Sequence, residues 1–463
     1  MKDITGTLPV VTAETFVIPL DGDSSIVYAP LRRAAFVANR HLVNFLAALS
    51  SGEWRRDVDP EDHAIEFLRG LEILDSGPET VPDLPSNKVL PPTLVTLFLT
   101  NACNLRCVYC YATAGELKRE TMDLATAQAA IQFVAQNAYH RGEKLFEVAY
   151  HGGGEPTQNW DVLIGSFRYA QLLAKDLGLT VRGTCATNGV LGRPQVDWII
   201  ANLAGASVSC DGLPEVQDAN RPTVAGRGTS KILLQTLRRF DEAGFPYGLR
   251  LTVLPNQIDQ LADSVEFLCQ ATAVQRIQAE PVYRMGRWES RSAAESGDFV
   301  AGFREAKKRA QRHGRELFFS AARVDSLSGH FCHATTDLFA VTPRGSVSAC
   351  FEVYSEGCNL ASEFLYGNLS AKGELCFDIT RQSRLRELTV HNIDYCRGCF
   401  ARWHCAGDCP NKRLAQKDTS GSERCDITRE LCKDILLERI RDSGGLFWHP
   451  DPRQERHIAV GED

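Results

Sequence analysis

Cysteines are the residues of this chain with the clearest capacity for chemistry. Cys103, Cys107 and Cys110 form a C-x3-C-x2-C motif within the segment T-N-A-C-N-L-R-C-V-Y-C-Y. Three thiolates held in one loop can bind three irons of a [4Fe–4S] cluster, and the fourth iron then stays open for a substrate or cofactor. Zinc is the alternative metal, but three thiolates from one short loop lack the fourth ligand that closes a structural zinc site.

The 16 cysteines are unevenly distributed along the chain. None precedes Cys103, three are scattered at Cys185, Cys210 and Cys269, and ten lie between residues 332 and 432. The N-terminus lacks the basic and apolar regions of a signal peptide, and no apolar run approaches the ~18 residues of a membrane span. We therefore expect a cytoplasmic protein whose cysteines are ligands, reactive thiols or core residues. The net charge of −7 favours neither nucleic acid nor a membrane as a partner.

Further polar motifs follow segments that are predicted to be strands. They are H-G-G-G-E-P at 151–156, T-N-G at 187–189, S-C-D-G at 209–212 and N-R at 220–221. Glycines let a backbone approach a ligand closely, and a backbone carbonyl or the Glu155 carboxylate can accept hydrogen bonds from an ammonium group. Ser209 and Asp211 are expected to share one face of their strand. Taken singly, these motifs are also compatible with a glycine-rich turn, a helix cap, a turn aspartate or a surface salt bridge.

Together the motifs resemble those of the radical S-adenosylmethionine (SAM) superfamily. The resemblance implies that the three loop cysteines hold a [4Fe–4S] cluster whose open iron chelates the amino and carboxylate groups of SAM. It implies one-electron cleavage of SAM to a 5′-deoxyadenosyl radical, which abstracts a hydrogen atom from the substrate. The residues expected to contact SAM are Tyr109, Gly153, Gly154, Glu155, Pro156, Asn188, Ser209, Asp211 and Arg221. Arg221 is expected to pair with the SAM carboxylate, and Glu280 is a weaker candidate for the same cavity.

The C-terminal cysteines follow the pattern C-x12-G-x4-C, then C-x2-C-x5-C-x3-C, then C. This pattern resembles the SPASM extension of radical SAM enzymes, although such spacings also occur in zinc ribbons. The resemblance implies two auxiliary [4Fe–4S] clusters, and therefore three clusters in all. The first auxiliary cluster would take Cys332, Cys350 and Cys409, and the second would take Cys396, Cys399, Cys405 and Cys425.

Two departures from sulfatase-maturing relatives bear on this assignment. Those relatives carry an extra cysteine shortly before the position of Cys332, and this chain has none there. The first auxiliary cluster therefore takes Cys358, with Cys376 a weaker candidate, or is open. The relatives also place an acid directly after the position of Cys350, where this chain has Phe351, followed by Glu352. We expect the remaining cysteines to be core residues, with Cys432 an alternative ligand.

The elements that must position these residues alternate between strand and helix through the middle of the chain. Strands are predicted at 93–100, 145–151, 179–187, 206–212, 247–255 and 274–282, and helices at 121–138, 160–177, 194–203, 229–244, 257–270 and 295–313. Strands that alternate with helices form parallel βα units, whose ligands lie at the carboxyl ends of the strands. We therefore predict an α/β protein with a partial (βα)6 TIM-like barrel.

The parts that flank this barrel have different patterns. Strands at 15–20 and 25–28 and helices at 32–52 and 60–74, followed by a Pro-rich linker at 76–92, predict a small winged-helix-like α+β module. The predicted domains are therefore an N-terminal module over 1–88, a radical SAM core over 89–320, a cysteine-rich SPASM domain over 321–440 and a weakly structured tail over 441–463.

The family resemblance favours an enzyme that modifies peptides. We expect a maturase that acts on a ribosomally made precursor peptide, bound in part by the N-terminal module, and that forms a thioether, a carbon–carbon bond or a small ring. An electron donor such as flavodoxin or ferredoxin is the implied protein partner. The alternatives are a sulfatase-maturing enzyme, which Phe351 argues against, and an electron-transfer or scaffold protein, which would need no SAM-binding motifs.

Overall fold

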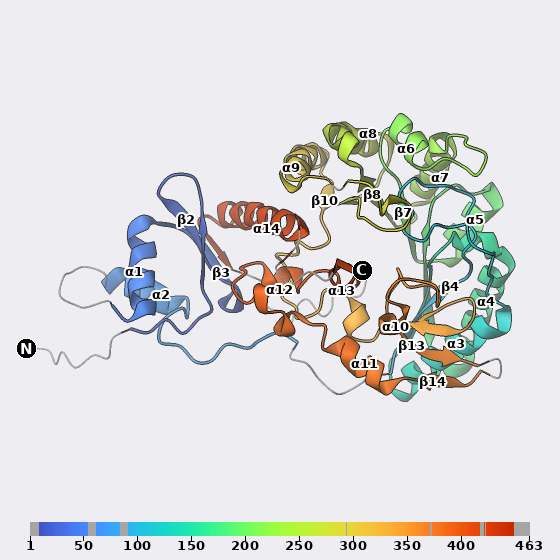
Figure 1. The fold of residues 1–463 in the computed structure, drawn as a ribbon, viewed down its shortest axis with the longest axis horizontal. Coiled ribbons are helices and arrows are strands. Elements are labelled where there is room, and N and C mark those ends of the chain that lie inside the picture. Colours follow the sequence, from blue (N-terminus) through green and yellow to red (C-terminus); the bar gives the residue numbers. More distant parts are fainter. Residues whose placement is uncertain are drawn as a thin grey trace, which may run out of the picture.

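The structure is a computed structural model that describes residues 9–53, 62–83, 91–292, 294–370, 373–416, 421 and 423–448. Figure 1 shows an N-terminal module on one side and a curved sheet covered by helices on the other. Part of the cysteine-rich region lies between them, and the rest lies beside the curved sheet. Three predicted segments lie partly outside the described residues: the start of the 60–74 helix, the 76–92 linker and the tail beyond residue 448.

A parallel sheet forms the partial barrel that the alternating pattern predicts. Its strands are β4 (Leu94–Phe98), β5 (Leu145–His151), β6 (Thr180–Thr187), β7 (Gly205–Ser209), β8 (Tyr247–Val253) and β9 (Arg276–Pro281). A seventh parallel strand, β10 (Glu316–Phe318), was not predicted and pairs with β9. The helices on the outer face are α3 (Leu124–His140), α4 (Trp160–Leu177), α5 (Arg193–Asn202), α6 (Pro214–Asn220), α7 (Ser230–Ala243), α8 (Leu261–Ala271) and α9 (Ser296–Arg312).

The barrel strands separate apolar from polar residues by their period of two. In β8, Leu249, Leu251 and Val253 are buried in the core beneath the helices, whereas Arg250 and Thr252 line the inner cavity. Strand β7 follows the same rule, with Val208 buried on the outer face and Ser207 and Ser209 facing inward. The inner wall of the barrel is therefore polar, as a ligand-binding cavity requires.

The cysteine-rich region continues the same sheet. Strand β11 (Ala340–Val341) pairs in parallel with β4, and β12 (Ser346–Ser348), β13 (Leu365–Leu369) and β14 (Leu375–Phe377) follow as antiparallel neighbours. The helices of this region are α10 (Ala361–Phe364), α11 (Ile379–Arg386), α12 (Arg402–Cys405), α13 (Pro410–Gln416) and α14 (Glu423–Asp442). Because β11 occupies the edge of β4, this region extends the barrel wall beside the cavity.

The N-terminal module is an antiparallel sheet with two helices. Its strands lie in the order β1 (Phe16–Pro19), β2 (Ser24–Ala29), β3 (Ala34–Asn39) and β15 (Leu446–Trp448), and its helices are α1 (Arg40–Ser51) and α2 (Asp62–Gly70). The predicted 32–52 helix was wrong over its first part, because residues 34–39 pair with β2 and the helix begins only after Asn39. The Asn39 side chain caps it by accepting a hydrogen bond from the Leu42 amide at 2.9 Å.

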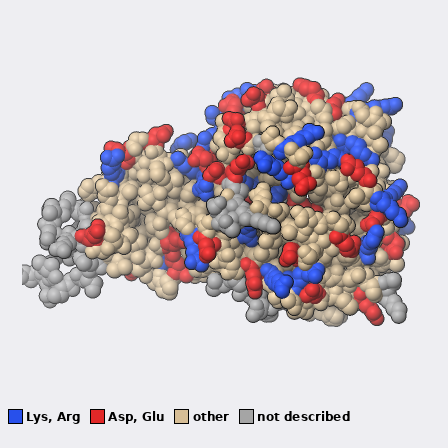
Figure 2. Space-filling model, viewed as in Figure 1, with Lys and Arg blue, Asp and Glu red and all other residues tan. Residues whose placement is uncertain are grey.

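The tail was also predicted incorrectly where it is described. Residues 446–448 form β15, which pairs with Ala34–Phe36 and covers the β3 edge of the N-terminal sheet. Among the helices of the described ranges, none has the length and apolar character that crossing a membrane requires. Acidic and basic side chains are interspersed on the face seen in Figure 2, without a large patch of one sign.

Candidate active site

A cavity of about 2780 Å³ runs through the barrel and continues between α9 and α14. Its wall combines the inner faces of the strands with the loop after β4, the H-G-G-G-E-P turn and residues 349–352 of the cysteine-rich region. This volume exceeds the roughly 300–1,000 Å³ of ordinary small-molecule pockets several-fold. The cavity therefore has room for a cofactor together with part of a larger substrate.

Cys103, Cys107 and Cys110 lie in the loop that follows β4, and all three line this cavity. Asn101 closes the loop, because its side chain donates to the Lys118 carbonyl and accepts from the Glu120 amide, both at 2.8 Å. Burial raises the pKa of Cys103 to about 12 and that of Cys107 to about 11. Thiolates at these positions therefore need a nearby cation.

The surroundings of the three sulfurs fit a [4Fe–4S] cluster. The Leu105 amide donates to the Cys103 Sγ at 3.4 Å, and the Asn188 side chain lies 3.7 Å from the same sulfur. Amide donors of this kind stabilise cysteine sulfurs that carry negative charge. Within the described ranges, no three His, Cys, Asp or Glu side chains are grouped as a single metal ion would require.

Two residues that the sequence analysis missed hold the loop from the β9 side. The Arg287 guanidinium donates to the carbonyls of Cys107 and Ala114, both at 2.9 Å. Gly286 has a φ of +52°, and a Cβ there would stand 2.2 Å from the Cys110 carbonyl oxygen. A Gly-Arg pair after a strand is too common to have indicated this role.

The H-G-G-G-E-P turn packs directly against the cysteine loop. A Cβ on Gly154 would stand 2.3 Å from the Ala102 carbonyl oxygen, so only glycine fits there. The Glu155 amide donates to that same carbonyl at 2.9 Å. Pro156 begins the short 3-10 helix Pro156–Asn159, and a Cβ on Gly153 would stand 2.6 Å from the Tyr354 ring.

The buried Glu155 carboxylate is occupied by the protein itself. It accepts hydrogen bonds from the Thr157 and Thr187 hydroxyls, both at 2.9 Å, and from the Asn188 backbone N–H at 2.8 Å. Burial raises the pKa of Glu155, although these hydrogen bonds oppose the effect. Of the two acceptors predicted for a ligand ammonium, the turn's backbone carbonyls are thus better placed than this carboxylate.

Asn188 joins the T-N-G motif to the cysteine loop, because its amide group donates to the Asn104 Oδ1 at 2.8 Å. Ser209 lines the cavity at the end of β7, but Asp211 does not line it. The expectation that Ser209 and Asp211 share a face was wrong because β7 ends at Ser209, so the alternation stops there.

Asp211 instead forms a buried group with Arg221 and Tyr109. The Arg221 guanidinium pairs with both Asp211 oxygens, at 3.1 and 3.2 Å, and lies 5.1 Å from the centre of the Tyr109 ring. The Tyr109 hydroxyl also donates to Asp211. Arg221 lines the cavity and lies 4.0 Å from the Cys107 Sγ, so it can reach a ligand beside the loop while Asp211 holds it.

The C-terminal cysteines fall into two neighbourhoods. The buried Cys350 thiol has a raised pKa because of burial first, and then because of Glu352, Cys409 and Cys332. The raised pKa of Cys396 follows from burial, then from Cys399 and Cys425, and Cys405 lies near Cys425 and Cys396. Each neighbourhood contains members of one expected ligand set, and Cys432 also lies close to Cys405 and Cys399.

Cys358 lies in a different setting. Its Sγ is 3.5 Å from the Ser355 hydroxyl. Burial, followed by the Cys358 thiol, raises the pKa of Tyr354, whose ring packs against the cysteine loop after β4. Unlike Cys332, Cys350 and Cys409, it does not line the cavity. Cys376 is exposed on β14, whereas Cys432 is buried. The role of Cys358 as a fourth ligand stays a prediction.

Buried charges also lie at the contact between the barrel and the cysteine-rich region, in addition to the pairing of β4 with β11. Arg424 of α14 pairs with Glu280 of β9 at 2.7 Å and with Asp408 at 2.6 Å. Burial is the largest single effect and would raise the pKa of Glu280. Arg424, together with Arg250 and the hydrogen bonds from Ser320 and Gln278, holds this pKa below its usual value. Lys412 pairs with Glu352 at 3.1 Å. Glu280 thus lines the cavity, as expected, but its charge is already paired.

Comparison with known proteins places these features in a family. Residues 97–268 match the model of the radical SAM superfamily. The sporulation killing factor maturation protein SkfB of Bacillus subtilis is 28% identical over 213 residues, which is 44% of this chain and 45% of SkfB. The mycofactocin maturase MftC of Mycolicibacterium smegmatis is 27% identical over 332 residues, which is 69% of this chain and 78% of MftC. This chain thus aligns with less than half of SkfB.

Two solved structures share the fold. The enzyme anSMEcpe with bound AdoMet superposes with a TM-score of 0.61 at 16% identity, over 76% of this chain and 96% of that one. SuiB of Streptococcus suis bound to S-adenosylmethionine gives a TM-score of 0.52 at 13% identity, over 89% and 98% of the two chains. At these identities the likeness concerns the fold.

Proposed function

Because this chain is a radical SAM enzyme related to SPASM-type peptide maturases, we propose that it modifies a ribosomally made precursor peptide and leaves a thioether, a carbon–carbon bond or a small ring. The observation that carries this proposal is the cavity that joins the cysteine loop to residues 349–352 of the cysteine-rich region. It is part of a larger space of about 2780 Å³ that exceeds the needs of SAM alone. The names of SkfB and MftC as maturation proteins, and the structure of SuiB bound to its precursor peptide SuiA, support a peptide substrate.

The cofactors of this reaction are SAM and a [4Fe–4S] cluster, and we assign the cluster to Cys103, Cys107 and Cys110. When bound, they supply the one-electron chemistry that removes a hydrogen atom from an unreactive carbon. The chain's own residues provide the surroundings for this chemistry. The backbone at Gly153 and Gly154 offers carbonyl acceptors to the SAM ammonium, and Arg221, held by Asp211, offers donors to its carboxylate.

We assign two auxiliary clusters to the cysteine-rich region, on Cys332, Cys350 and Cys409 and on Cys396, Cys399, Cys405 and Cys425. Cys358 is the proposed fourth ligand of the first cluster. These clusters would accept the electron that remains after bond formation or bind the substrate, and a flavodoxin or ferredoxin would reduce the SAM-binding cluster. The neighbourhoods of Cys350 and Cys396 support both sets.

We further propose that the N-terminal module binds part of the precursor. An extended peptide can add a strand to a free sheet edge. In the described part of the chain, β15 covers the β3 edge, whereas the outer edge of β1 pairs with no strand. The edge of Phe16–Pro19 is therefore where a leader segment would add.

Co-expression with a short reading frame next to the gene tests the function. A crosslinked product loses the mass of two hydrogen atoms and keeps its cysteine sulfur, and tandem mass spectrometry locates the closed ring. Product of unchanged mass from fully loaded, reduced enzyme would contradict the proposal for that precursor.

A sulfatase-maturing activity is the second candidate. Glu352 lines the cavity one residue beyond the position of the acid in that class, and its carboxylate pairs with Lys412. Formylglycine carries an aldehyde, so a hydrazide probe labels that product and does not label a crosslinked peptide. An electron-transfer protein is the third candidate, and it would not cleave SAM.

A further inference from the structure

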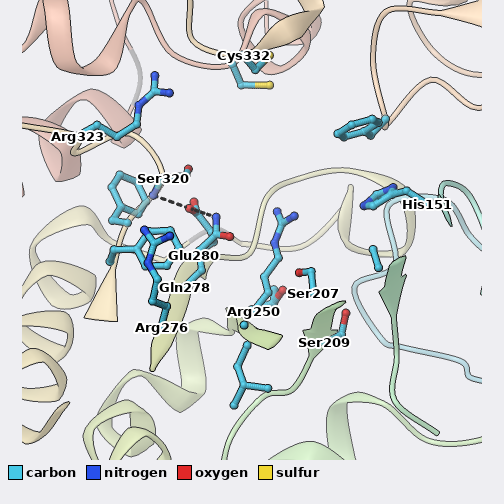
Figure 3. Close-up of a pocket in the computed structure, with 18 of the residues that line it drawn as sticks. His151, Ser207, Ser209, Arg250, Arg276, Gln278, Glu280, Ser320, Arg323 and Cys332 are labelled. Carbon is cyan, nitrogen blue, oxygen red and sulfur yellow. Dashed lines mark hydrogen bonds between the residues drawn. The ribbon is translucent and has the colours of Figure 1, made fainter. Parts of the chain in front are cut away.

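Arg250 is a cation that faces the cavity without a carboxylate. It lies on the inner face of β8, and its side chain is exposed to the cavity. Figure 3 shows its guanidinium pointing away from the strand into open space. The described residues supply it with no hydrogen bond or ion pair, whereas Arg221, Lys412 and Arg424 along the same wall each pair with a carboxylate.

Two hydroxyls and a histidine N–H lie beside Arg250, whereas Glu352, a nearby carboxylate that acts on His151 together with Arg250, pairs with Lys412. Ser209 is the pairing partner of Arg250 on β7, and Ser207 lies two residues earlier on the same face. Neither hydroxyl forms a hydrogen bond within the part of the chain that the structure describes. On β5, the His151 Nδ1 accepts from the Gly152 amide at 2.7 Å, so its Nε2 carries the proton and can donate. Burial, followed by Arg250, lowers the pKa of His151 to about 4, so this ring is neutral at pH 7.

Arg250 lies between the cysteine loop and the opposite wall, because its charge acts on Tyr111, directly after Cys110, as well as on groups of that wall. Its charge acts on Lys412, Glu280 and His151, which belong to the wall shared with the cysteine-rich region. The pKa of Cys107, which burial raises, is lowered by Arg221 and Arg287 instead. Phe351 forms the adjoining surface, with its ring 4.8 Å from that of His151 and a 38% exposed side chain. A substrate between the loop and this wall would pass over Arg250.

We propose that Arg250 binds a carboxylate of the peptide substrate and selects peptides with an acidic group beside the modified residue. A guanidinium pairs with a carboxylate through two parallel hydrogen bonds, and the serine hydroxyls and the His151 N–H add donors around it. The inference rests on the proposed peptide substrate. The carboxylate is that of an aspartate or glutamate side chain, or of the peptide's C-terminus.

The test uses the reconstituted full-length protein, with SAM present, to select from a random decapeptide library. One library has amidated C-termini and the other has free C-termini. Enrichment of aspartate or glutamate from the amidated library identifies a side chain, and enrichment only from the free library identifies the terminus. Arg250→Gln should reduce retention of these peptides on the order of 10-fold, Arg250→Lys should keep part of it, and Arg250→Glu should shift the selection toward lysine and arginine.

Arg276→Gln is the matched control, because Arg276 lines the same cavity but pairs with Glu316 at 2.8 Å. This variant should select the same peptides as wild type. Selection of peptides without an acidic preference would overturn the role of Arg250 and leave the proposed function standing. Loss of SAM binding by Arg250→Gln in equilibrium dialysis without peptide would reassign Arg250 to the SAM carboxylate. If wild type selects no peptide, this inference fails, whereas the proposed function is judged separately by co-expression with the precursor.

Discussion

Single residues in and around the cavity divide into those whose hydrogen bonds and ion pairs the protein itself completes and those whose side chains face open space. Glu155 and Asp211 belong to the first group, since their carboxylates are held by neighbouring donors. Arg250 and Ser209 belong to the second group, since their side chains line the cavity and form no hydrogen bond with the described residues. The first group fixes the shape of the site, and the second is available to ligands.

His151 provides a test of this electrostatic picture. Its pKa of about 4 lies below the value of roughly 6.5 in the unfolded chain. Between these values the unfolded chain takes up a proton that the folded protein does not, so stability falls as the pH drops from 7 to 5. His151→Asn should remove up to about 2 kcal/mol of this acid sensitivity. Thermal melting of wild type, His151→Asn and the exposed-site control His41→Asn at both pH values measures it.

An equal loss of melting temperature in wild type and His151→Asn would contradict the lowered pKa.

The motifs alone could predict that Glu155 belongs to the site, but not that its carboxylate is fully occupied, because its partners Thr187 and Asn188 are brought in by β6. Arg250 was missed because a single arginine in an apolar strand is most simply explained as a solvent-exposed residue.

Secondary-structure elements were predictable where local signals agree. Strand β5 and helix α4 have the predicted bounds, because Phe146, Val148 and Tyr150 alternate and Gly178 ends the helix in a left-handed conformation. The 32–52 prediction failed because the run A-A-F-V-A-N is compatible with both helix and strand. Its pairing with β2 and with β15, some 400 residues away, decided the outcome, and no local pattern contains that information.

The contact between the β5 turn and the cysteine loop should not tolerate a methyl group. Gly154→Ala would force a Cβ to 2.3 Å from the Ala102 carbonyl oxygen, so the loop that carries Cys103 must shift. We expect loss of SAM binding on the order of 10-fold or more, measured by equilibrium dialysis of the reconstituted protein. Gly297→Ala, in α9 with nothing within 4 Å of its Cβ, is the control. Wild-type SAM affinity in Gly154→Ala would refute the proposed packing.

At the scale of the whole molecule, buried polar contacts add to the strand pairing that joins the three parts of the chain. Arg424 bridges β9 and the cysteine-rich region, and the Tyr28 hydroxyl of the N-terminal module lies 2.5 Å from His404 Nε2 beside Cys405. The Trp403 indole donates to Glu14 at 2.6 Å. The contacts Arg424–Glu280, Tyr28–His404 and Trp403–Glu14 each join residues more than 100 positions apart, so the sequence could indicate three parts but not how they meet.

Arg424→Ala should destabilise the joint between barrel and cysteine-rich region. It leaves Glu280 and Asp408 buried without their cation, a change that costs about 3–5 kcal/mol. Arg429, on the same helix, is 43% exposed and pairs with Asp426, so Arg429→Ala should cost about 1 kcal/mol or less. Differential scanning fluorimetry compares the two, and equal melting temperatures would contradict a structural role for the buried pair.

Cleavage of SAM by anaerobically reconstituted and reduced protein is the most direct test of a SAM-binding cluster at Cys103, Cys107 and Cys110. Wild type should hold about 12 irons per chain and form 5′-deoxyadenosine, whereas the triple alanine variant should hold about eight irons and form none. Formation of 5′-deoxyadenosine by the triple variant, or its absence from fully loaded wild type, would contradict the assignment.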